Sequence, residues 1–100
     1  MFQILAEGDI ELAESEWLNF YDKKTAHIKL VYDDDDEASA GIFVESIDDY
    51  GWSAVKNVDP NEAEANFHDY LDHLKGTNGA TMKDFKEFFS PKGWDIDWLC

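Results

Sequence analysis

Arginine is missing altogether from this 100-residue sequence. Eight lysines face 23 aspartates and glutamates, so the formal net charge is −15. Arginine is the residue best suited to bidentate contacts with phosphates and guanine edges. A chain this acidic is also repelled by the phosphates of nucleic acid. We therefore exclude direct binding of DNA or RNA, and the same repulsion excludes an anionic membrane surface.

Cysteine is almost absent too, since Cys100 is the only one. A single cysteine cannot form a disulfide within the chain, which is typical of proteins in the reducing cytosol. Residues 1–20 contain no lysine, no long apolar run and no small-residue cleavage site, so they do not resemble a signal peptide. No window approaches the ~20 apolar residues of a membrane-spanning helix. We expect a cytoplasmic protein.

Aromatic residues, by contrast, are plentiful: seven Phe, four Tyr and four Trp. They supply the hydrophobic core that a disordered acidic chain would lack. A chain of this length buries roughly two-thirds of its unfolded surface, which suffices for one domain. We expect residues 1–100 to form a single acidic domain, with Trp52, Trp94 and Trp98 in its core.

The first 24 residues allow two interpretations. Residues 2–6 alternate in polarity and predict a strand, and Glu7-Gly8-Asp9 is typical of a turn. Residues 10–21 then fit a helix capped by Asp9, because apolar side chains recur at helical spacing. Alternatively, residues 17–21 form a strand that is connected to the next strand by a turn at 22–24. We favour the helix, since residues 11–14 are mostly good helix formers.

The middle of the sequence predicts an antiparallel meander. Residues 26–32 and 41–47 are strand-like, and the acidic segment 33–40 between them is too charged to lie in a strand. A second turn at 48–51 leads to a third strand over 52–55. One face of such a sheet is buried and the other is solvated.

Two helices and a closing strand follow. Asp59, Pro60 and Glu62 form a helix start with a capping box, and Lys75-Gly76 marks the end of that helix. A shorter helix opens at Thr81 and stops at Ser90-Pro91, and residues 94–98 alternate like a strand. Together these patterns predict an α+β fold, an antiparallel sheet of about four to five strands with two or three helices packed on one face.

Metal-ligating residue types occur without the spacing of a metal site. In the acidic loop Asp33–Glu37, the sixth and twelfth positions of a calcium-binding loop are Ala38 and Val44 instead of Gly and Glu. The helical residues His68, Asp69, Asp72 and His73 form two i,i+4 pairs. The two imidazoles lie about 140° apart around the helix axis, so they do not converge. We expect no metal and no cofactor.

Motifs of catalysis are also missing. Gly76-Thr77-Asn78-Gly79 lacks the lysine and hydroxyl residue of a phosphate-binding loop, and Cys100 has no defined neighbours. With 23 carboxylates, pairs arise by chance, and a general acid would need a buried, apolar setting. We do not expect an enzyme.

The charge itself is the strongest functional signal. A net charge of −15 exceeds the magnitude of about 2–8 that solubility requires of a small domain. Residues 1–50 carry 14 acids against three lysines, whereas residues 51–100 carry nine against five. Since self-repulsion destabilises a compact state, we expect the charge to serve a function.

We therefore expect a small inhibitor that mimics nucleic acid and occupies the basic cleft of a nuclease or other nucleic-acid-binding protein. Phage anti-defence proteins, such as anti-CRISPR or anti-restriction proteins, and immunity proteins against nuclease toxins are two settings for it. The predicted contacts with this basic partner are Asp33, Asp34, Asp35, Asp36, Glu37, Asp48, Asp49 and Tyr50. The alternative is a cation-binding or adaptor module without a nuclease partner. The oligomeric state stays open.

Overall fold

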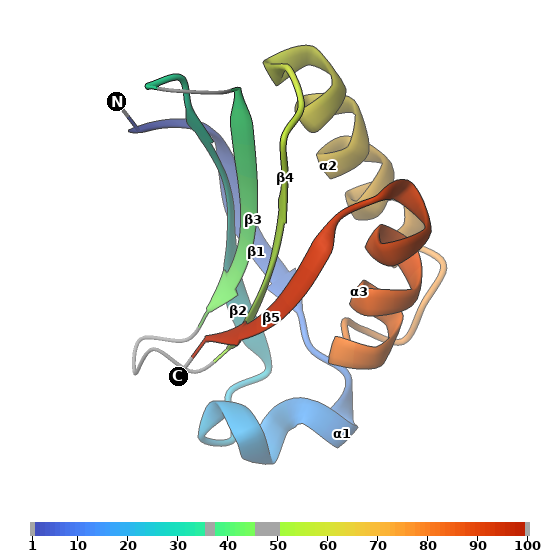
Figure 1. Cartoon of the computed structure of the whole chain (residues 1–100). Coiled ribbons are helices and arrows are strands. Elements are labelled where there is room, and N and C mark those ends of the chain that lie inside the picture. Colours follow the sequence, from blue (N-terminus) through green and yellow to red (C-terminus); the bar gives the residue numbers. More distant parts are fainter. Residues whose placement is uncertain (1, 36–37, 46–50, 100) are drawn as a thin grey trace.

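A five-stranded antiparallel sheet forms one layer of the molecule (Figure 1). The computed structural model describes residues 2–35, 38–45 and 51–99. The strands pair in sequence order, so the sheet is a meander. They are β1 (Phe2–Glu11), β2 (Thr25–Asp33), β3 (Ser39–Glu45), β4 (Gly51–Lys56) and β5 (Asp95–Leu99).

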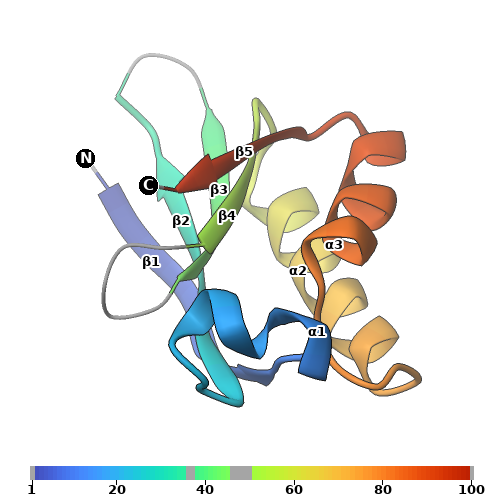
Figure 2. The ribbon, with the colours of Figure 1, turned by 90° about the horizontal axis from the view of Figure 1, so that it is seen from below.

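The helices form the second layer. They are α1 (Glu14–Trp17), η1 (Leu18–Phe20), α2 (Pro60–Leu74), α3 (Met82–Phe89) and η2 (Ser90–Lys92). Figures 1 and 2 show α2 and α3 side by side on one face of the sheet, with α1 and η1 at one end. None of the described helices covers the opposite face. The predicted α+β fold is confirmed, and no described helix has the length and apolar character that crossing a membrane requires.

The core lies between the sheet and the helices. Its largest fully buried side chains are Trp52, Tyr70, Phe20, Phe67, Phe85 and Phe89. Trp52 meets Phe20 edge-on at 5.4 Å between ring centroids and Phe85 at 6.2 Å. The predicted burial of Trp52 and Trp94 is confirmed, whereas Trp98 is 50% exposed.

Both long helices begin where their caps predict. The side chain of Asp59 accepts a hydrogen bond from the Glu62 backbone N–H at 2.8 Å, directly before Pro60. The hydroxyl of Thr81 likewise accepts from the Asp84 N–H at 3.0 Å. Each cap contributes about 1 kcal/mol by satisfying a backbone donor that the helix itself leaves unpaired. The predicted stop of the shorter helix at Ser90-Pro91 is confirmed, since α3 ends at Phe89 with Ser90 as its C-cap, and the chain then forms the short 3₁₀ helix η2.

The turn predicted at residues 7–9 is wrong, and so is the first part of the helix predicted over residues 10–21. Strand β1 runs through residues 7–9 to Glu11, with Gly8 opposite Ile28 and Ile10 opposite Ala26. Ile10 is buried while Glu7 and Asp9 are exposed, which is the period of two of a strand. Helix begins only at Glu14. The alternative strand over 17–21 is also wrong, because that segment is helical through Phe20 and ends at residues with positive φ.

Tyr70 has a hydroxyl that is buried with no hydrogen-bond partner among the described residues. Burial, and secondarily the carboxylate of Asp84, raises the pKa of Tyr70 well above its usual value, so the hydroxyl stays neutral. We expect Tyr70→Phe to increase the free energy of unfolding by about 1 kcal/mol, because it removes an unsatisfied polar atom. Urea denaturation measures this, with the half-buried Tyr32→Phe as control. A clear loss of stability would contradict the unpaired hydroxyl.

Gly79 holds the loop between α2 and α3 against the end of β1. Ala80 bridges Leu12, with the Ala13 N–H donating to the Ala80 carbonyl at 3.1 Å. Gly79 has φ of 118°, and a Cβ there would lie 2.5 Å from the backbone nitrogen of Ala13. Gly79→Ala should therefore cost about 3 kcal/mol of stability through strain and overlap with backbone.

Thermal unfolding followed by circular dichroism checks that prediction. Gly8→Ala is the matched control, since no atom lies within 4 Å of a Cβ at Gly8. Similar melting temperatures for the two variants would contradict the assigned loop conformation.

Candidate protein-binding face of the sheet

The sheet face opposite α2 and α3 carries the candidate site, and we call it the open face. Alternation along the strands decides which side chains lie on it, since Ile28, Leu30, Ile42 and Val44 point into the core. Its apolar side chains are Phe2, Ile4, Val31, Phe43 and Val55. Its carboxylates are Glu7, Asp9, Glu11, Asp33, Glu45, Asp95 and Asp97.

Apolar side chains form a band across the open face that reaches the edge strand β1. The register places Ile4, Val31, Gly41 and Val55 in one row across four adjacent strands. Ile4 is 58% exposed and Val55 42% exposed, although both are hydrophobic. The ring of Phe43 lies over Gly41, within 3 Å of where a Cβ would stand. Beside it lies a shallow hollow of about 270 Å³.

Carboxylates lie beside this apolar band. The edge strand β1 presents three of them at alternate positions, and β5, the other edge strand, presents two. Lys29 is the one lysine on the described part of the face, with its Nζ 3.0 Å from Glu45 Oε1 and 5.8 Å from the Phe43 ring centroid. His27 lies with its ring nitrogens 3.5 Å from Glu7 and 3.8 Å from Asp9. The described part of the face therefore combines an apolar band with carboxylates on both edge strands.

Three of the eight predicted contact residues can be placed. Asp33 ends β2, and Asp34 and Asp35 follow it at the same edge of the open face. The Asp35 backbone N–H donates to Asp33 Oδ1 at 3.0 Å, and this bond holds the pKa of Asp33 below its ordinary value. The other five lie outside the described residues: Asp36, Glu37, Asp48, Asp49 and Tyr50.

The three aspartates also bring carboxylate oxygens within 4.8 Å of one another. Oxygen ligands suit a hard cation such as calcium. An exposed acidic cluster alone does not define a metal site, so we assign none to these residues.

Sequence reasoning missed the carboxylates of the edge strands. On β1 the signal was the alternation of Glu7, Asp9 and Glu11, which the predicted turn concealed. On β5 the alternation of Asp95 and Asp97 was recognised, but nothing in the sequence shows that both edge strands share a face. The structure brings these acids into one surface.

Among the described residues, the His and Asp side chains at i,i+4 spacing on α2 form no ion pair with one another. His73 Nε2 instead lies 3.0 Å from both carboxylate oxygens of Asp84 on α3. Its ring also packs against Phe88, at 5.1 Å between centroids. His73 therefore joins α2 to α3, which is a structural role.

No protein-family model, no curated protein and no solved structure matches this chain.

Proposed function

We propose that this protein is a small acidic inhibitor that binds the basic nucleic-acid-binding surface of a nuclease or related protein. One observation carries the proposal: the sheet face that no described helix covers combines a band of exposed apolar side chains with seven carboxylates of the described residues. Protein–protein interfaces likewise combine apolar contact area with polar groups at the rim.

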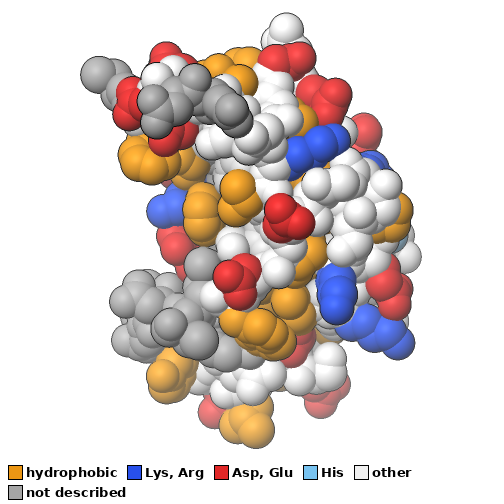
Figure 3. All heavy atoms as spheres, in the orientation of Figure 1, with side chains coloured by type: hydrophobic (Ala, Val, Ile, Leu, Met, Phe, Trp, Pro, Cys, Tyr) orange, Lys and Arg blue, Asp and Glu red, His pale blue; other side chains and the backbone are white. Residues whose placement is uncertain are grey.

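Charge complementarity favours a partner with a basic surface. Lysines and arginines that normally meet phosphate would form charge-assisted hydrogen bonds with the carboxylates of the open face. Figure 3 shows red and orange side chains along the strand side, at the left, and most of the visible blue ones over the helices. An acidic face of this kind attracts a basic surface over long range and accelerates encounter.

Two biological settings use this chemistry. One is a phage anti-defence protein against an RNA-guided nuclease or a restriction enzyme. The other is an immunity protein that neutralises a nuclease toxin. Both act in the cytoplasm, and the single cysteine of the chain is in keeping with that compartment.

A binding panel tests the proposal. The purified chain would be measured against an RNA-guided nuclease, a restriction enzyme and a bacterial DNase toxin by biolayer interferometry at low and high salt. We expect at least one nuclease to bind, to lose affinity as salt rises, and to release the chain when duplex DNA is added. Nuclease activity should fall in parallel. Binding that neither salt nor duplex DNA weakens, or binding to none of the three, would contradict the proposal.

A further inference from the structure

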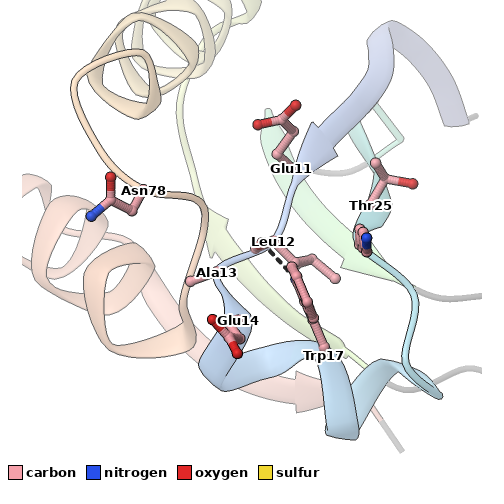
Figure 4. A pocket seen from close by; sticks show the side chains of 8 residues that line it. Glu11, Leu12, Ala13, Glu14, Trp17, Thr25 and Asn78 are labelled. Carbon is pink, nitrogen blue, oxygen red and sulfur yellow. Dashed lines mark hydrogen bonds between the residues drawn. The ribbon is translucent and has the colours of Figure 1, made fainter.

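A second hollow, of about 590 Å³, lies beside the end of β1 (Figure 4). Its walls come from the end of β1, from α1, from the start of β2 and from the loop before α3. Its polar or aromatic lining residues are Glu11, Glu14, Trp17, Lys24, Thr25 and Asn78. Glu11 also belongs to the open face, so the hollow adjoins the carboxylates of that face.

Backbone hydrogen bonds hold this hollow in shape. The Leu12 N–H donates to the Lys24 carbonyl at 2.8 Å, and the Ala80 N–H donates to the Glu11 carbonyl at 2.8 Å. The indole Nε1–H of Trp17 donates to the Leu12 carbonyl at 2.9 Å, which fixes the orientation of the ring (Figure 4). A site that is ordered before binding loses little conformational entropy when a ligand enters.

The chemistry of the hollow favours a cation. The Nζ of Lys24 lies 5.1 Å from the Trp17 ring centroid, so the indole already makes a cation–π contact within the chain. The carboxylates of Glu11 and Glu14 are exposed, and neither forms a hydrogen bond or ion pair with the described residues. Figure 4 shows these two side chains on either side of the Leu12–Ala13 backbone.

We propose that this hollow binds an arginine side chain of the partner protein, stacked on the Trp17 indole and attracted by the carboxylates of Glu11 and Glu14. A guanidinium is planar, weakly hydrated and bidentate, so it stacks and pairs better than an ammonium does. It would displace the exposed Lys24 side chain from the ring. The chain has no arginine of its own, so the guanidinium comes from outside. The assignment of its source rests on the proposed function, whereas the arginine preference does not.

Peptide titration tests the arginine preference without a nuclease. The ¹⁵N-labelled full chain would be titrated with a capped hexa-arginine peptide and with a capped hexa-lysine peptide. We expect the Trp17 indole N–H resonance to shift saturably with hexa-arginine, and hexa-lysine to bind about tenfold more weakly. Equal affinity for the two peptides, or a Trp17 resonance that hexa-arginine does not move, would overturn the proposal.

A charge-matched pair of variants locates the binding. Glu11→Gln combined with Glu14→Gln should weaken hexa-arginine binding about tenfold. Asp69→Asn combined with Glu87→Gln removes the same charge from the exposed helical side and should have little effect. Equal losses in the two variants would show that only net charge matters.

The nuclease panel separates the two proposals. Nuclease binding that survives Glu11→Gln with Glu14→Gln removes the hollow from the interface but leaves the proposed function intact. A Trp17 response to hexa-arginine without binding of any nuclease leaves the arginine site in place and removes the proposed function.

Discussion

Replacing Trp52 with alanine should lower the free energy of unfolding by about 4 kcal/mol. Trp52 is 0% exposed on β4, between Phe20 of the short helix η1 and Phe85 of α3. Removing the indole leaves a cavity that the sheet and two helical segments border, and they cannot all collapse into it. Domains of this kind are stable by only about 5–15 kcal/mol, so this single change removes a large share of the stability.

Trp98→Ala is the matched control for that prediction. Trp98 lies directly opposite Trp52 in the pairing of β4 with β5, yet it is 50% exposed. Because half of its surface stays in water, we expect its removal to cost about 1 kcal/mol. Urea denaturation followed by circular dichroism measures both variants. Equal losses would contradict the burial of Trp52 beneath the helices.

Features that depend on neighbours in the sequence were predictable. The starts of α2 and α3 are set by Asp59 and Thr81, whose side chains bond backbone N–H groups three residues ahead. Strand β2 was predictable for a similar reason, since Ile28 and Leu30 alternate with His27 and Lys29. Local chemistry decides these elements, so a short window of sequence is sufficient.

Strand β1 depends on partners far away in the sequence. Glu7-Gly8-Asp9 has the composition of a turn, but each residue pairs with a residue of β2 about 20 positions later. The burial of Tyr70 on α2 also depends on distant residues, because its ring packs against Phe85 and Phe89 of α3. Only packing against α3 brings the Tyr70 side of α2 inward, and no pattern within the helix itself shows this. Tertiary contacts override local propensity at both places.

The candidate site also depends on contacts between residues that are far apart in the sequence. The predicted contacts were two short acidic segments, Asp33–Glu37 and Asp48–Tyr50, because such runs are visible in the sequence. Most carboxylates of the open face come instead from β1 and β5, near the two ends of the sequence and at opposite edges of the sheet. Only the order of the strands and the alternation of side chains place them on one surface.

Neutralising four carboxylates of the open face should weaken binding to the proposed nuclease partner about 100-fold at 0.1 M salt. The variant combines substitutions at the two edge strands: Glu7→Gln, Asp9→Asn, Asp95→Asn and Asp97→Asn. Each exposed ion pair contributes less than about 1 kcal/mol, so four together give an effect of this size. The salt dependence of affinity should also flatten, because fewer charge contacts remain to be screened. Biolayer interferometry across a salt series measures both quantities.

A control with the same net charge decides whether the face or the overall charge matters. It combines Glu64→Gln, Asp69→Asn, Asp72→Asn and Glu87→Gln, all on the helical layer. Even the shortest extent of the molecule, 20 Å, is about two Debye lengths at 0.1 M salt, where the Debye length is about 10 Å. Charges on the far side are therefore screened from a partner on the open face, and this variant should retain its affinity. If it loses as much affinity as the open-face variant, binding depends on net charge and the open face is not the contact surface.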